Sequence, residues 1–174
     1  MKGHLSLHSD PLLPIPKTTS EATLLQSIRV GNLVQMTLYP NHIYMAVSPT
    51  AITLAAIESG NVAICEYVAT LVSCDWNAIE AISRKTCLCY AIERGAKEVA
   101  SFIIKQPTLL INGVGMDGLD ETALHSASLK GYDNLIVELL QHGAHVDTQT
   151  SLGNSALSTL YFFKFHSAGC ENGK

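Results

Sequence analysis

Residues 122–131 read Thr-Ala-Leu-His-Ser-Ala-Ser-Leu-Lys-Gly, and residues 132–143 read Tyr-Asp-Asn-Leu-Ile-Val-Glu-Leu-Leu-Gln-His-Gly. Each segment carries a helical pattern and ends in a glycine. In the first, Thr122 predicts a helix start, because its hydroxyl can accept a hydrogen bond from a free backbone N–H of the first turn. Leu124 and Ala127 then share one helical face, so a short amphipathic helix is expected before the first glycine.

The second segment predicts another short helix with one apolar side. Its large apolar residues form a stripe at Leu135, Ile136, Leu139 and Leu140. A glycine ends each helix, at the position where a left-handed conformation is favoured. Two helices this short cannot bury their apolar faces alone, so the pattern predicts similar units stacked against them.

The pattern repeats along the chain. Thr122 and Ser155 are 33 residues apart, and the helix-ending glycines Gly60, Gly95 and Gly131 are spaced by 35 and 36 residues. Apolar residues stand four, five and eight positions after each glycine: Ile64, Cys65 and Val68; Val99, Ala100 and Ile103; Leu135, Ile136 and Leu139. This matched spacing predicts at least three equivalent units.

The stretch resembles the ankyrin-repeat family, with Ala123 where that family usually has proline and His125 in its usual place. The resemblance is strong over residues 83–157 and weaker over 20–82. It implies an all-α solenoid of stacked helix-turn-helix units joined by hairpin or loop connectors. It also implies a structural role for His125, which would hydrogen-bond within its own repeat.

The chain is expected to divide into repeats between two flexible ends. The expected units are a flexible leader (1–19), a degenerate first repeat or cap (20–46), three repeats (47–82, 83–118 and 119–151), an incomplete fifth repeat (152–166) and a flexible tail (167–174).

Composition excludes several classes. The net charge of −4 gives no basic face for nucleic acid, and no apolar run reaches the roughly 18 residues that suggest a membrane span. The first 20 residues lack the apolar core of a secretory signal. Five cysteines form no regular framework, so free thiols in a cytoplasmic or nuclear setting are expected.

The resemblance implies an adaptor or scaffold that binds a partner protein through its concave surface, with no cofactor. The crowded acidic residues Asp117, Asp120 and Glu121 predict a partner with a basic patch. Trp76 has two interpretations, packing at the base of a connector or an exposed anchor. The candidate partner-binding residues are Asp75, Trp76, Glu80, Arg84, Lys85, Tyr90, Glu93, Arg94, Asp117, Asp120, Glu121, Ser126, Leu129, Lys130, Gln149 and Ser151.

Two other hypotheses belong to different classes. The chain can be a truncated or spliced piece of a longer ankyrin-repeat protein without activity of its own. It can also be a thiol- or metal-dependent enzyme that uses a cysteine or the cluster of His142, His145 and Asp147. The sequence holds no phosphate-binding loop, nucleophile elbow or His-Glu-x-x-His motif, so an enzyme is disfavoured.

The C-terminal segment departs most from the family. Nine positions carry six large apolar residues: Leu157, Leu160, Tyr161, Phe162, Phe163 and Phe165. One helix can turn only about half of them onto the preceding repeat, and no second helix is evident. We therefore expect this end either to dock on another chain, including a second copy, or to fray.

Overall fold

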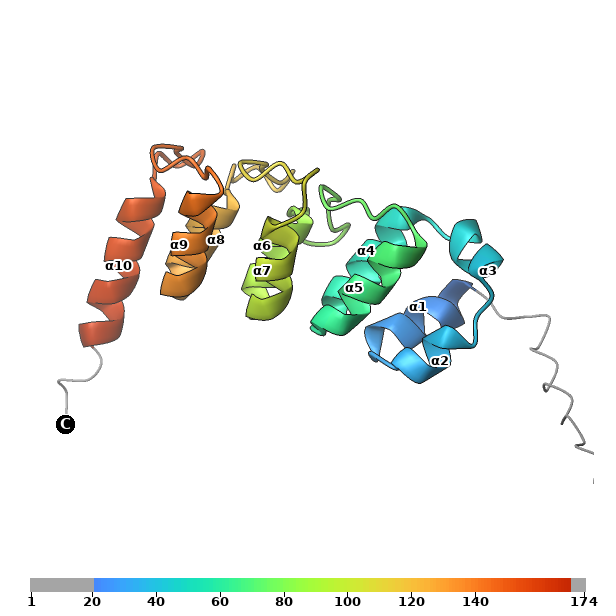
Figure 1. Ribbon diagram of the computed structural model, residues 1–174. Helices are drawn as coiled ribbons and strands as arrows, with labels where there is room; N and C mark the ends of the chain where they lie inside the picture. Colours follow the sequence, from blue (N-terminus) through green and yellow to red (C-terminus); the bar gives the residue numbers. More distant parts are fainter. Residues whose placement is uncertain (1–20, 170–174) are drawn as a thin grey trace, which may run out of the picture.

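The computed structural model describes residues 21–169, with side chains described as far as 162. The expected leader at 1–19 and the end of the tail lie outside the described residues. Ten helices follow one another in a row (Figure 1). They are α1 (Glu21–Arg29), α2 (Leu33–Thr37), α3 (Asn41–Ala46), α4 (Pro49–Glu58), α5 (Val62–Leu71), α6 (Cys87–Glu93), α7 (Lys97–Ile104), α8 (Ala123–Lys130), α9 (Asp133–Gln141) and α10 (Ala156–Gly169).

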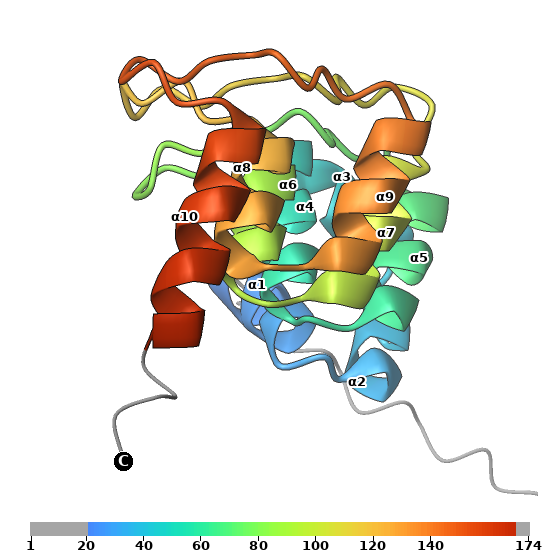
Figure 2. The ribbon, with the colours of Figure 1, turned by 90° about the vertical axis from the view of Figure 1, so that its left-hand side faces the viewer.

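The helices form two layers. The first helices of successive units, α4, α6, α8 and α10, lie behind one another in one layer, and α5, α7 and α9 form the other (Figure 2). The connectors contain only isolated bridges among the described residues, Ile79 with Thr86 and Gln149 with Ser155. The prediction of an all-α solenoid is confirmed. None of the helices within 21–169 combines the length and apolar character that crossing a membrane requires.

Local sequence explains where the helices begin and end. The Thr86 hydroxyl accepts a hydrogen bond from the backbone of Cys89 at 3.3 Å, which caps α6. Gly60, Gly95 and Gly131 have φ angles of 66°, 77° and 65° after the first helix of each unit. This left-handed conformation costs glycine least, so these three positions end the helices as the spacing predicts.

A single apolar core runs between the layers. Ile64, Val99 and Leu135, which hold the same offset from the three glycines, are at most 4% exposed. Cys65 is fully buried in the same core and fills the position of a small apolar side chain, as expected. Because this core is shared by all the units, each unit depends on its neighbours for burial.

Two asparagines link neighbouring connectors in the same way. Asn77 donates to the carbonyl of Thr108 at 2.8 Å and accepts from the backbone N–H of Leu110 at 2.8 Å. One unit later, Asn112 donates to the carbonyl of Gly143 at 3.1 Å and accepts from the backbone N–H of His145 at 2.8 Å. Neither asparagine was predicted from the sequence to make these contacts.

The connector tips are also joined to one another. The backbone N–H of Met116 donates to the Arg84 carbonyl at 2.6 Å, and that of Ser151 donates to Leu119 at 3.0 Å. A side chain at Gly115 would place its Cβ 2.5 Å from the same Arg84 oxygen. Glycine at this position therefore allows the close approach of the two connectors.

His125 has the expected structural role and also reaches the next unit. The Thr122 N–H donates to Nδ1 of His125 at 3.3 Å, so the ring proton lies on Nε2. Nε2 then donates to the carbonyl of Asn154 at 3.1 Å. One buried imidazole thus fixes the start of α8 and ties it to the connector that precedes α10.

The two ends of the stack differ from a regular unit. Helix α3 follows the helix pair of the first unit, and the Tyr44 hydroxyl of α3 donates to the Met36 carbonyl at 2.8 Å. At the other end α10 continues to Gly169, beyond the boundary expected at 166. No helix follows α10 in the described part of the chain.

The Asn112 link can be tested by Asn112→Ala. Removing the amide leaves the Gly143 carbonyl and the His145 N–H without this partner. Because the site is exposed, we expect the free energy of unfolding to fall by about 1 kcal/mol, as measured by urea denaturation. Asn134→Ala, at an exposed position of α9, is the control and should change the stability by less than about 0.5 kcal/mol. Equal effects of the two substitutions would contradict the role of Asn112.

Candidate binding surface on the concave side

The connectors and the first helices enclose the candidate surface. In Figure 2 the connectors run across the top of the stack and extend past the layer of α6, α8 and α10, away from α7 and α9. They meet that layer at an angle. We call the inside of this angle the concave surface.

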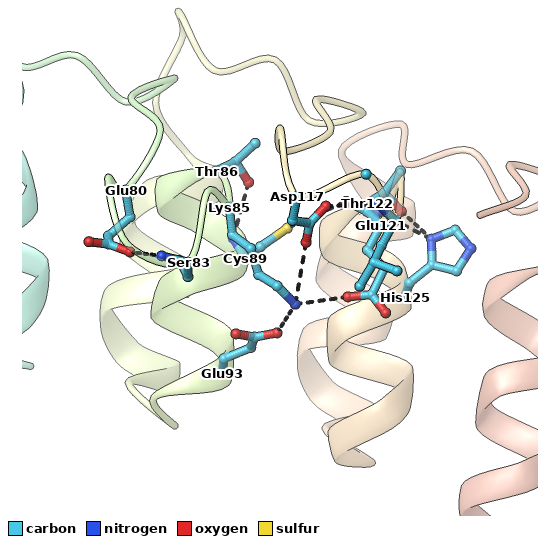
Figure 3. A network of polar contacts seen from close by, with 12 residues as sticks. Glu80, Ser83, Lys85, Thr86, Cys89, Glu93, Asp117, Glu121, Thr122 and His125 are labelled. Atoms are coloured by element: carbon cyan, nitrogen blue, oxygen red, sulfur yellow. Dashed lines mark hydrogen bonds and ion pairs between the residues drawn. The ribbon is translucent and has the colours of Figure 1, made fainter. Parts of the chain in front are cut away.

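Lys85 holds two units together on this surface. Its Nζ lies 3.0 Å from Oε2 of Glu121 and 3.9 Å from Oδ2 of Asp117, and it also donates to Glu93 (Figure 3). Lys85 and Glu93 belong to the unit of α6, whereas Asp117 and Glu121 precede α8. The Lys85 side chain is only 16% exposed, so it serves as an inter-repeat contact.

The charges in this network do not cancel. Burial on its own would lower the pKa of Lys85, but hydrogen bonds to Glu93 and Glu121 outweigh it and hold the pKa above its usual value. One ammonium therefore faces the carboxyl groups of Glu93, Asp117 and Glu121. This part of the concave surface remains acidic.

The structure corrects the expectation of three free acidic groups at one tip. Asp117 and Glu121 are half-buried and paired with Lys85. Asp120 alone of the three is exposed, with a left-handed φ of 54°. Sequence spacing could not show this, because Lys85 is contributed by the preceding connector.

A second polar group lies further along the first helices. The Tyr90 hydroxyl donates to Glu58 at 3.3 Å, and Glu58 also pairs with Arg29. The guanidinium of Arg94 lies 5.4 Å from the centre of the Tyr90 ring, within the range of a cation–π contact. Burial, followed by the nearby Glu58 charge, raises the pKa of Tyr90. These contacts connect α1, α4 and α6 across the concave surface.

Glu80 is not available to a partner. Its carboxylate accepts hydrogen bonds from the backbone N–H groups of Ile82 at 3.0 Å and Ser83 at 2.6 Å, and the residue is 8% exposed. Hydrogen bonds from the backbone of Ser83 and Ile82 lower the pKa of Glu80. The expectation that Glu80 contacts a partner is therefore wrong, because the side chain closes its own turn.

Two further candidates are buried. Trp76 is 5% exposed and packs edge to face against Phe102, with ring centres 5.5 Å apart. The packing interpretation of Trp76 is right, and the interpretation as an exposed anchor is wrong. Ser126 is 1% exposed within α8, so its side chain is also not accessible to a partner.

The remaining candidates fall into two groups. The exposed residues are Asp75, Arg84, Arg94, Asp120, Leu129, Lys130, Gln149 and Ser151. The half-buried residues are Lys85, Tyr90, Glu93, Asp117 and Glu121. Their role in binding a partner stays a prediction.

A row of apolar side chains on the connectors was not predicted from the sequence. Ile82, Leu119 and Leu152 are 92%, 38% and 75% exposed. Each stands one or two residues before a left-handed position, which is Arg84, Asp120 or Gly153. Leu119 and Leu152 lie three residues before Thr122 and Ser155, and Ile82 lies four before Thr86, so an alignment of these segments that allows a shift of one residue would have found them.

The thiols give no support to a cysteine enzyme. Burial raises the pKa of Cys65 to about 12 and also raises the pKa of Cys74, Cys87 and Cys89. A thiol with a raised pKa stays protonated at neutral pH and is a poor nucleophile. Cys170 lies outside the described residues.

The histidine cluster also shows no metal geometry. His142, His145 and Asp147 are all exposed, and the His142 Nδ1–H donates to the Glu138 carbonyl at 2.9 Å. Among the side chains that the structure describes, no group of three or more His, Cys, Asp or Glu residues could hold a metal ion.

The comparisons agree with the geometry. The family described as ankyrin repeats (3 copies) matches residues 52–150, more than half of the 174-residue chain. The match covers α5 to α9, the part with the regular glycine spacing. None of the curated proteins matches the chain.

Glu80→Gln tests the turn assigned to that side chain. Because the pKa of Glu80 is lower in the folded chain, its stabilisation is present above its unfolded pKa of about 4.3 and is lost as pH falls through the folded value. Glu80→Gln should therefore be less stable than the parent at neutral pH, and the difference should shrink in acid. Urea denaturation across this pH range measures it.

The control is Glu66→Gln, at an exposed position of α5. Its free energy of unfolding at neutral pH should differ from that of the parent by less than about 0.5 kcal/mol. A Glu80→Gln deficit that does not change with pH would refute the carboxylate-specific role.

Proposed function

Because this chain belongs to the ankyrin-repeat family, we propose that it is an adaptor or scaffold that binds a partner protein on its concave surface. Repeats of this family are generally protein–protein interaction modules and typically non-enzymatic. The adaptor role goes further than family membership, since a fold does not name its partner.

The observation that carries the proposal is the row of connector-tip residues Ile82, Leu119 and Leu152. Single exposed apolar residues are common on any protein. Here, however, each of three successive connectors presents at least one, beside the exposed charges Arg84 and Asp120. Apolar side chains within a polar rim are typical of a protein-binding surface.

We propose that the partner carries a basic patch. The Lys85 network has three carboxyl groups around one ammonium, and Asp120 adds an exposed charge nearby in sequence. Charges of this kind mainly speed encounter with a partner of opposite sign. The free thiols of Cys65, Cys74, Cys87 and Cys89 support a reducing setting in the cytoplasm or nucleus as part of the proposal.

A second candidate activity is self-association at the α9–α10 end. Both helices face the viewer at this end in Figure 2. Leu157 is 65% exposed, and Val137 and Leu140 of α9 are 54% and 40% exposed. In the part of the chain that the structure describes, no later helix covers α9. We propose that a second copy buries these side chains.

Partner binding can be tested by retention on the immobilised full chain. The double variant Ile82→Ser with Leu152→Ser should lose a retained partner by at least about tenfold, because truncating anchoring side chains weakens interfaces most. The matched control is Val34→Ser with Val137→Ser, which removes exposed valines from α2 and α9. Equal retention by both double variants would reject the concave surface as the binding site.

Self-association has a separate test. Sedimentation velocity of the full chain should show a concentration-dependent increase in mass, and Leu157→Glu should abolish it, since burying an unpaired charge is costly. Ile82→Glu adds the same charge at a connector tip distant from this end and should leave the association intact. A parent chain that stays monomeric at high concentration would reject the idea.

A further inference from the structure

A groove lies at the C-terminal part of the concave surface. It has a volume of about 700 Å³, which is comparable to ligand-binding clefts. Its walls come from the connectors that precede α8 and α10 and from these two helices. The lining residues that carry the argument are Leu119, Glu121, Leu129, Leu152, Tyr161 and Phe162.

The large side chains of the groove are apolar and exposed. Leu129 of α8 is 43% exposed, and Leu152 of the last connector is 75% exposed. Tyr161 and Phe162 of α10 are 64% and 59% exposed. Removing such side chains from water favours association, because the hydrophobic effect grows with the apolar area buried. A clustered set of this size therefore favours an apolar ligand group.

The polar atoms of the groove are largely engaged within the chain. The hydroxyls of Ser158 and Thr159 donate to the Ser155 carbonyl at 2.8 and 3.0 Å. The Asn154 carbonyl accepts from His125. The groove therefore offers few convergent polar groups of the kind that orient a small molecule. Recognition must depend mainly on apolar side chains and on charge.

The charge at the groove is negative. Glu121 lines it, and the same side chain belongs to the Lys85 network with Asp117 and Glu93. Lys130 is exposed but is not part of the lining. A lysine or arginine entering beside Glu121 would meet an excess of carboxylate over ammonium, which is charge complementarity.

We propose that this groove binds a segment of a partner protein in which large apolar side chains lie next to lysine or arginine. The proposal rests on the proposed protein-binding function and adds the chemistry of the partner. The apolar side chains fill the space between Leu129, Leu152 and α10, and the cation lies beside Glu121.

The test uses a display library of random short peptides, selected on the folded full chain. The enriched sequences should share at least one large apolar residue adjacent to lysine or arginine. A peptide made from that consensus should bind the Leu152→Ser variant at least about tenfold more weakly. Val34→Ser, which removes an exposed apolar side chain of α2 outside the groove, should leave the affinity unchanged.

Charge is tested with Glu121→Gln, after its folded state has been checked by circular dichroism. We expect slower association and a weaker dependence of the association rate on salt. A peptide of the same apolar residues with its lysines replaced by glutamate should bind the parent chain more weakly.

Several results would overturn the proposal: no enrichment, a consensus without a basic residue, or binding indifferent to Leu152→Ser. So would a Leu152→Ser variant that loses self-association, because the occupant would then be a second copy. If a retained partner still needs Ile82 and Leu152 while no peptide is enriched, the concave-surface function stands and the groove proposal fails.

Discussion

The fold depends on the fact that one pair of short helices cannot bury its own apolar faces. Every described unit therefore shares its core with a neighbour, and polar contacts fix the relative position of the two. Asn77 and Asn112 perform this task between successive connectors, and the Lys85 network performs it between the unit of α6 and the segment that precedes α8. The hydrogen bond from His125 to the Asn154 carbonyl links the unit of α8 to the connector that precedes α10. The concave surface is continuous because these contacts recur from one unit to the next.

The same requirement decides which side chains remain for a partner. Glu80 and Trp76 stabilise the connector to which they belong, and Lys85 is surrounded by carboxylates from two units. These polar and aromatic residues of the connectors thus make their contacts within the chain. The exposed residues at the tips, such as Ile82 and Leu152, make no comparable contribution to the core. Their exposure is easier to explain by binding than by stability.

The regular part of the fold could be predicted from the sequence because it rests on local signals. Glycine at 60, 95 and 131 and the apolar residues at fixed offsets after it determine helix ends and buried faces, and the structure has both. The candidate surface was predicted only in outline. Whether a charged residue such as Glu121 is free depends on Lys85, 36 residues earlier in the chain, and no periodic pattern records that pairing. The groove was missed for the same reason, since its walls come from separate segments that meet only in the stack.

We propose above all that the concave surface, rather than the outer layer of helices, binds a partner. Hydrogen–deuterium exchange of the full chain with and without a retained partner tests this claim most directly. Binding should slow exchange in the connectors and in the first helices α6 and α8, and leave α5 and α7 unchanged. Protection confined to α5, α7 and α9, with unchanged exchange in the connectors, would contradict it.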